Sequence, residues 1–206
     1  PFSLPHWGGG KLIERNTMRI VLIGRPGAGK GTLAKQLECN LGFYILTPGA
    51  LYREEANLGT EFGLRAKSYW ADGNLCPDEM TNELVRKTLD KLNSQNIIFD
   101  GYPRRLTQAQ YLDSITQIGL VIDLNIDDDT SVKRLLGRRE KENRLDDTEE
   151  IIRQRLIVYH SNNDEIVNYY LSSLSKYVVI NSDLTREEVF DSVKNIIEDY
   201  MMEIKV

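Results

Sequence analysis

The hydrophobic positions of the chain gather in five short runs that are separated by longer polar segments. The runs are continuous and do not alternate, which is typical of strands covered on both faces, as in a parallel sheet. They are MRIVLIG at 18–24, FYILT at 43–47, NIIFDG at 96–101, LVIDLNI at 120–126 and YVVINS at 177–182. Helix-like segments lie between them, so strand and helix alternate. The pattern predicts an α/β fold with a five-stranded parallel sheet flanked by helices.

Two of the polar segments carry clear helical signals. From Asp147 to Leu174, apolar side chains recur at the spacing of one helical face, which predicts a long helix packed on the core. Thr185 and Glu188 form a capping-box pattern at the start of a closing helix. Residues 1–17 contain three consecutive glycines and little pattern, so we expect a flexible extension before one domain at 18–206.

Composition and charge narrow the possible partners. A chain of 206 residues with 41% hydrophobic composition suits one compact domain, and its net charge of −5 disfavours nucleic acid and anionic membranes as partners. No apolar run approaches the roughly 18 residues of a membrane span, and the first segment lacks the apolar centre of a secretion signal. Cys39 and Cys76 form no CxxC pair, so we expect two buried thiols in a reducing, cytoplasmic compartment, although an organelle stays open.

A glycine-rich motif, GRPGAGKGT at 24–32, follows the first predicted strand directly. Its glycines let the backbone N–H groups point at phosphate oxygens, at the positive end of a helix that begins near Lys30. Lys30 supplies charge to the β and γ phosphates, and because Gly31 follows it, the hydroxyl comes one residue late, on Thr32. The order of strand, loop and helix favours a phosphate site over a structural turn, and therefore predicts ATP or GTP binding. The donor contacts expected in this loop are Gly27, Ala28, Gly29, Lys30, Gly31 and Thr32.

A second motif, FDGYPRRLTQAQ at 99–110, follows the third predicted strand. Asp100 ends that strand, where an uncompensated carboxylate is costly, so a hydrated Mg²⁺ beside the phosphate loop is a fitting partner; a structural cation is the alternative. Arg104 offers a planar fork for a phosphate. Gln108 carries an amide whose donor and acceptor match the edge of adenine, a pairing worth about 1–3 kcal/mol of discrimination. The segment falls where α/β sheets bind ligands, which favours an AMP site over a merely polar helix start.

The two motifs, in this order, resemble those of nucleoside monophosphate kinases, adenylate kinases above all, and the resemblance covers nearly all of residues 18–200. It implies a P-loop NTPase three-layer fold, Mg²⁺ as cofactor, and ATP and AMP as substrates, with ADP as the substrate in reverse. It also implies a monomer with two insertions, a monophosphate-binding insertion at about 47–76 and a short lid at about 137–147. No general base is needed, because the attacking phosphate of AMP is already anionic.

The segment LTPGALYREE at 46–55 resembles the start of the family's monophosphate-binding insertion, with two departures. Pro48 stands where similar adenylate kinases carry Thr, and Ala50 where most members carry Asp. The first change removes a hydroxyl near the base and the second removes one support of the Mg²⁺ shell, so we expect reduced activity or an altered acceptor. The AMP contacts that the resemblance implies are Thr47, Gly49, Arg53, Cys76 through its backbone, Gly101, Arg104, Gln108, Arg144 and Arg155.

A basic run, KRLLGRREKENR at 133–144, contrasts with the acidic chain around it. Such a run is usually a solvated helix face, and some of its cations fit that interpretation. The resemblance nevertheless places the phosphate-clamping arginines here and in the next helix: Arg134, Arg138, Arg144 and Arg155. The expected catalytic set is Lys30, Arg104, Arg138, Arg144 and Arg155. Arg134 and Arg138 are expected to bind ATP. Arg153 is interpreted as surface charge. Asp146 and Asp147 are expected to cap the following helix and to hold lid arginines when the lid closes.

Other functions stay open at this point. A kinase for UMP or CMP on the same fold is disfavoured by Gln108, although Pro48 leaves room for it, and GTP remains an alternative donor because the loop reads phosphates. A weakly active or inactive nucleotide-binding module is suggested by Ala50. The presence of Lys30, Asp100 and the clamp arginines argues against such decay.

Overall fold

A computed structural model of the chain describes residues 17–92, 95–142 and 147–203. The strands are β1 (Arg19–Gly24), β2 (Tyr44–Leu46), β3 (Ile97–Asp100), β4 (Leu120–Asn125) and β5 (Lys176–Asn181). The helices are α1 (Lys30–Leu41), α2 (Pro48–Asn57), α3 (Glu61–Trp70), α4 (Asp78–Lys91), α5 (Leu106–Ile115), α6 (Asp128–Glu142), α7 (Glu149–Leu171) and α8 (Arg186–Glu203). Each strand lies within a residue or two of its predicted run.

The five strands form one parallel sheet in the order β2-β3-β1-β4-β5, which confirms the predicted fold class. β1 lies at the centre and pairs with β3 on one side and β4 on the other. The chain order therefore reverses next to β1, which makes its carboxyl end the switch point at which such sheets bind ligands. The loop at residues 24–29 leaves β1 at this point, between β1 and α1.

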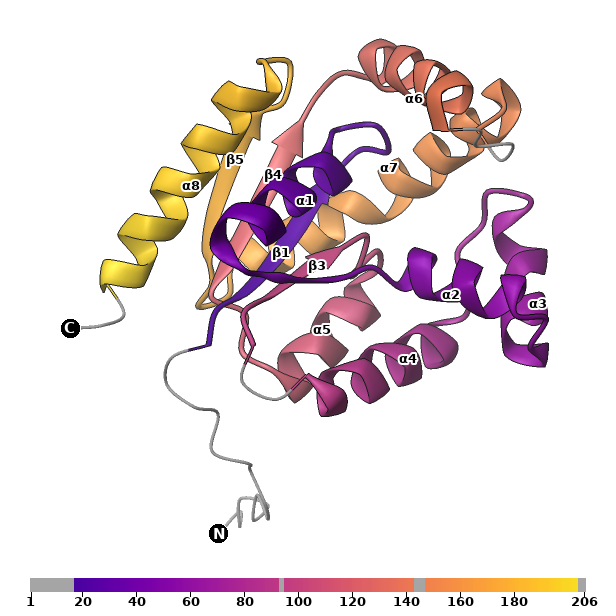
Figure 1. Cartoon of the computed structure of the whole chain (residues 1–206), viewed down its shortest axis with the longest axis horizontal. Helices are drawn as coiled ribbons and strands as arrows, with labels where there is room; N and C mark the ends of the chain where they lie inside the picture. Colours follow the sequence, from indigo (N-terminus) through magenta and orange to yellow (C-terminus); the bar gives the residue numbers. More distant parts are fainter. Residues whose placement is uncertain (1–16, 93–94, 143–146, 204–206) are drawn as a thin grey trace, which may run out of the picture.

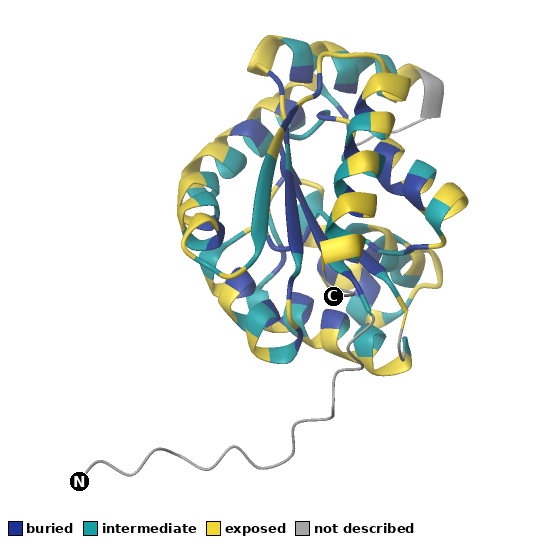
Figure 2. Cartoon of the chain, turned by 90° about the vertical axis from the view of Figure 1, so that its left-hand side faces the viewer, coloured by how far each residue is buried: buried dark blue, intermediate teal, exposed yellow. Residues whose placement is uncertain are grey.

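Helices cover both faces of the sheet. Successive side chains of β1 point to opposite sides and are apolar, so both sides need to be covered. Ile20 and Leu22 pack in one cluster with residues of α1 and α8, and Val21 and Ile23 pack in another with residues of α4, α5 and α7. Figure 1 shows these three layers, and Figure 2 shows the mostly buried strands between helices whose outer sides are exposed. The continuous apolar runs follow directly from this double coverage.

Two further groups of helices extend beyond the sheet. α2 and α3 lie within the expected insertion at 47–76 and have a small core of their own, where the Tyr52 ring lies 5.4 Å from Phe62 and 6.4 Å from Trp70 between ring centroids. α6 packs against α7, and the expected lid at 137–147 starts within α6 (Figure 1). Residues 143–146 of that lid, and residues 1–16 of the expected extension, lie outside the described residues.

The helix ends both support and correct the sequence analysis. The capping box of α8 is confirmed, since Glu188 N donates to Thr185 Oγ1 at 3.3 Å and Thr185 N donates to the Glu188 carboxylate at 2.9 Å. The expected cap of α7 is wrong for Asp147, because Thr148 occupies the N-cap and accepts from Ile151 N at 3.3 Å. One expected burial is also wrong. Cys76 is buried, but Cys39 is exposed on the outer side of α1.

Candidate active site

The phosphate loop has the backbone that its glycines predict. Gly24, Gly27 and Gly29 have φ values of 135°, 84° and 89°, which residues with a side chain rarely adopt. Space also excludes a side chain, because a Cβ at Gly24 would lie 2.4 Å from Leu124 O. Gly29 is the N-cap of α1 and provides no side-chain acceptor, so the first-turn N–H groups stay available to an anion.

Lys30 lies at the start of α1 and folds back over the loop. Its Nζ donates to Gly24 O at 2.6 Å and to Arg25 O at 2.8 Å. Burial lowers the pKa of Lys30 to about 8; the Asp100 carboxylate opposes this shift, and the Arg104 guanidinium adds to it. The ammonium group therefore lies within the electrostatic field of the second motif as well as in the phosphate loop.

Asp100 connects the two motifs. It is the last residue of β3 and lies in register with Leu22 of β1, and a Cβ on Gly31 would lie 3.5 Å from its Oδ2. The carboxylate therefore lies against the first turn of α1. A cavity of about 250 Å³ adjoins it, and its lining residues are Gly31, Lys35, Ile45, Thr47, Ala50, Leu51 and Asp100. Thus Asp100 and Thr47, from different parts of the expected site, face one cavity.

Two more expected AMP contacts lie together on α2. A Cβ on Gly49 would lie 3.6 Å from Arg53 Nη1, so the guanidinium of Arg53 runs back along the first turn of the helix. Thr47 is the N-cap residue of α2, and its side chain makes no capping hydrogen bond. The cavity beside Asp100 therefore has the start of α2 as one wall.

Arg104 and Gln108 are fixed by contacts with each other and with the backbone. Arg104 Nε donates to Gly101 O at 2.9 Å, and a Cβ on Gly101 would lie 2.7 Å from Arg104 Nη2. The amide of Gln108 is buried; its Oε1 accepts from Arg104 N at 2.7 Å and its Nε2 donates to Asp78 at 2.8 Å. Among the described residues this amide makes no further hydrogen bond, so one amide hydrogen and one lone pair are left for a ligand.

Asp78, an acidic residue in the first turn of α4, organises this part of the site. Its carboxylate accepts from Arg105 Nη1 at 2.7 Å, from Thr107 Oγ1 and from Gln108 Nε2. Burial alone would raise the pKa of Asp78, but the three hydrogen bonds outweigh it and hold the pKa below its usual value. Arg105 also reaches the backbone of the expected contact Cys76, whose carbonyl accepts from Nη1 at 3.4 Å.

The described arginines that were expected to clamp phosphates, Arg134, Arg138 and Arg155, have two sets of partners. Arg138 and Arg155 meet at Asp147, whose side chain is fully buried; Arg138 donates from Nε and Nη2 at 2.8 and 2.9 Å, and Arg155 from Nη1 at 2.6 Å. Arg134 turns instead to the loop after β5 and donates to Ser182 O at 2.9 Å. Asp147 therefore holds Arg138, which lies within the expected lid, and Arg155, which lies outside it.

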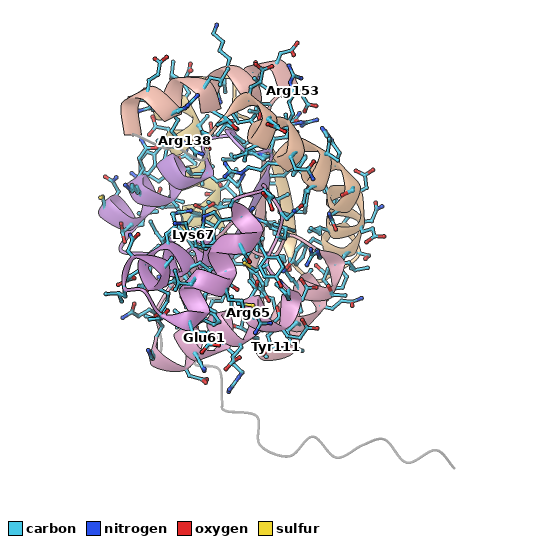
Figure 3. All side chains as sticks on the ribbon, turned by 90° about the vertical axis from the view of Figure 1, so that its right-hand side faces the viewer. Glu61, Arg65, Lys67, Tyr111, Arg138 and Arg153 are labelled. Carbon is cyan, nitrogen blue, oxygen red and sulfur yellow. The ribbon has the colours of Figure 1, made fainter. Side chains whose placement is uncertain are left out.

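Arg144 and Asp146 lie outside the described residues, whereas Arg153 can be placed. Arg153 is exposed and pairs with Glu149 of its own helix at 2.7 Å. In Figure 3 it lies at the upper edge of the molecule, away from Arg138. This position agrees with its interpretation as surface charge.

The fold and the site together define a class of protein. A glycine loop at the switch point, Asp100 at the end of the neighbouring strand and arginines paired with Asp147 form the arrangement expected of a P-loop kinase that acts on nucleoside monophosphates. Comparison with known proteins identifies the family. The sequence model described as adenylate kinase matches residues 22–175.

Relatives among known proteins agree with this assignment. An adenylate kinase of Phocaeicola vulgatus is 33% identical over 187 residues, which cover 88% of this chain and 98% of the relative. Adenylate kinase 1 of a Nostoc species is 37% identical over 182 residues, covering 85% and 96%, and an adenylate kinase of Kocuria rhizophila is 41% identical over 161 residues, covering 74% and 84%. The chain belongs to the adenylate kinase family, and its reaction is phosphoryl transfer between ATP and AMP. The comparisons favour neither a UMP or CMP kinase nor an inactive module.

Proposed function

We propose that the chain performs this reaction, MgATP plus AMP to two ADP, with the donor at the phosphate loop and the acceptor between α2 and the Gly101–Gln108 segment. The observation that carries the proposal is the pairing of β1 with β3, which sets Asp100 beside the first turn of α1. Since parallel strands end at one edge of the sheet, donor and acceptor residues meet there. Residues 18–206 form the kinase domain in this proposal, with the insertion at about 47–76 and the lid at about 137–147.

The donor is bound by backbone and by charge. The N–H groups of residues 27–32 receive phosphate oxygens at the positive end of α1, and Lys30 exchanges its two carbonyl partners for the β and γ phosphates. Arg134 and Arg138 of α6 complete the donor side. ATP is preferred over GTP in this proposal on family membership, because the loop itself reads phosphates.

The acceptor is bound by the second motif and the insertion. Gln108 offers its remaining amide hydrogen and lone pair to adenine, while Asp78 and Arg104 N hold the amide in one orientation. Arg53 and Arg104 bind the phosphate of AMP as charged forks. The remaining contacts proposed for AMP are Thr47, Gly49, Cys76 and Gly101, with Arg144 and Arg155 added when the lid closes.

Transfer itself requires positioning and charge neutralisation more than covalent chemistry by the protein. Arginines delivered to the moving phosphoryl group are worth about 10³ to 10⁵ in rate. Asp147 holds Arg138 and Arg155 side by side, so the two cations approach the group as a pair. A lid that closes only over both nucleotides excludes water and so suppresses hydrolysis.

The residues beside Asp100 fit a magnesium ion. The Asp100 carboxylate, acting through water, and the Thr32 hydroxyl would hold Mg²⁺ together with the phosphates of the donor. Mg²⁺ commonly uses one or two protein oxygens beside phosphates and water, and the described residues contain no cluster of three or more acidic, His or Cys side chains that would cage a metal. When bound, the ion neutralises charge on the β and γ phosphates. Ala50, on the cavity wall, has no side-chain oxygen to offer to this shell.

Assembly and location form part of the same proposal. The monomer rests on membership of the adenylate kinase family, and the two free thiols support a reducing, cytoplasmic compartment. Among the described helices, none has the length and apolar character needed to cross a membrane.

The direct test supplies purified protein with Mg-ATP and, separately, with AMP, UMP, CMP or GMP, and measures formation of the nucleoside diphosphates. Rapid ADP formation with AMP alone, lost in Lys30→Ala, supports the proposal and shows that Pro48 and Ala50 are tolerated. A faster reaction with another acceptor would remove AMP from the Gln108 site. Tight nucleotide binding without turnover would overturn the proposal in favour of a binding module.

A further inference from the structure

Two serine side chains hold the phosphate loop from outside it. Ser131 of α6 donates its hydroxyl to Pro26 O, and Ser182, directly after β5, donates its hydroxyl to Ala28 O. Both serines are buried, with 0% and 5% of their surface exposed. A buried hydroxyl is costly unless it is hydrogen-bonded, so these two contacts are well defined.

Holding a carbonyl also orients the N–H group of the next residue. In a trans peptide the C=O and the following N–H point in opposite directions. The hydrogen bond from Ser131 to Pro26 O therefore turns the N–H of Gly27 away from Ser131. The hydrogen bond from Ser182 to Ala28 O likewise turns the N–H of Gly29 away from Ser182. Neither glycine N–H finds an acceptor within the described part of the chain, so both are available to a ligand.

The loop needs such external support because of its own sequence. Gly27 and Gly29 both have φ values that glycine adopts freely, so their peptide planes are weakly restrained by the backbone itself. Ser182 also links the loop to the donor-side arginine, since its carbonyl accepts from Arg134 Nη2 at 2.9 Å and its Oγ lies 3.5 Å from Arg134 Nη1.

We propose that Ser131 and Ser182 are positioning residues for the donor phosphates, which fix two peptide planes so that the Gly27 and Gly29 N–H groups meet phosphate oxygens. The proposal rests on the donor role of the loop proposed above. It assigns the two hydroxyls to phosphate binding by the loop and separates them from the binding of adenine or AMP.

The test measures binding in Ser131→Ala and Ser182→Ala by calorimetry, with Mg-ATP and with inorganic triphosphate plus magnesium. Loss of one hydrogen bond that orients the loop is expected to weaken both ligands by about three- to tenfold in each variant. The KM for AMP is expected to change by less than about twofold, because its site is untouched. Triphosphate has no base, so an equal loss for the two ligands places the defect in the phosphate cradle.

Ser175→Ala is the matched control. Ser175 Oγ donates to Ile118 O at 2.9 Å, also a serine hydroxyl on a backbone carbonyl, at the opposite end of β5 from Ser182. We expect this variant to lose similar stability and to keep its affinity for both ligands. If either loop variant does not fold, the other carries the test.

Folded loop variants that bind triphosphate as the unchanged protein does would overturn the proposal. So would a loss in AMP affinity equal to the loss in ATP affinity, since that result shows a general structural defect. Absence of ADP formation by the unchanged protein would refute the proposed function alone, because triphosphate binding still reports on the two serines.

Discussion

The substitution Asp147→Asn tests whether burial or the distance between the charged atoms determines the strength of an ion pair in this protein. The change keeps the shape of the side chain but removes its charge and turns one acceptor into a donor that faces two guanidinium groups. Removing one member of a buried ion pair costs about 3–5 kcal/mol. The side chains of Arg138 and Arg155 are 31% and 18% exposed, so part of each guanidinium rehydrates. We therefore expect a loss of about 2–4 kcal/mol in the free energy of unfolding.

The control is an ion pair with the same distance between its charged atoms but with greater exposure to solvent. Arg153 and Glu149 are 2.7 Å apart, as are Arg138 Nη2 and Asp147 Oδ2, but their side chains are 65% and 58% exposed. An exposed pair of this kind is worth about 0.3–0.5 kcal/mol, so Glu149→Gln should change stability by no more than that. Salt should weaken the control pair further, whereas it should affect the buried group much less.

Urea-induced unfolding of both variants, followed by circular dichroism, gives the two free energies. For a chain of this size the Asp147 variant should also melt about 5–15 °C lower. A loss below about 1 kcal/mol for Asp147→Asn, or a loss equal to that of the control, would refute the argument from burial. Such a result would mean that solvent reaches the three charged groups freely.

Three further perturbations test other parts of the site. Because burial lowers the pKa of Lys30 to about 8, the free protein loses the Lys30 charge as pH rises through this value, and kcat/KM for ATP should fall in the same range. Above that pH, ATP binding should take up a proton from the buffer, and a flat pH profile of kcat/KM would contradict this reasoning. Asp78→Asn should raise the KM for AMP about tenfold and leave that for ATP unchanged, because the amide of Gln108 loses its ionised partner, and steady-state kinetics with each nucleotide varied decides it. Gly63→Ala should destabilise the α2–α3 unit by about 1–3 kcal/mol in unfolding experiments, since the new Cβ would lie 2.2 Å from Ala56 N; unchanged stability would show that the helices separate easily.

The sheet was predictable because its cause is local in the sequence. Strands covered on both faces are apolar at their buried positions, and the buried residues of β4 at Leu120–Asn125 are apolar and lie within the run predicted at 120–126. The phosphate loop was predictable for a similar reason, since its glycines and Lys30 lie within one short stretch at 24–30. In both cases a short stretch of chain contains the physical requirement.

The supports of the site were not predictable, because their partners are distant in the chain. Asp78 reads as an acidic first turn of α4, yet it binds side chains 27 to 30 residues away. Ser131 lies in a polar segment and Ser182 ends a predicted strand, and a serine at either place has many possible partners. Asp147 was expected to cap a helix as well as to hold arginines, and Thr148 took the cap because the carboxylate is buried against the arginines. Tertiary contacts decide these roles.

The two serine contacts also affect when the loop can form during synthesis. Ser131 reaches Pro26 across 105 residues, and Ser182 reaches Ala28 across 154 residues. The glycine loop leaves the ribosome early, but its last restraint arrives only when β5 and the residue after it have emerged. Folds dominated by such long-range contacts form slowly. Nucleotide binding by a nascent chain would therefore mark synthesis beyond β5, and a chain that stops before β5 would leave the loop without its second anchor.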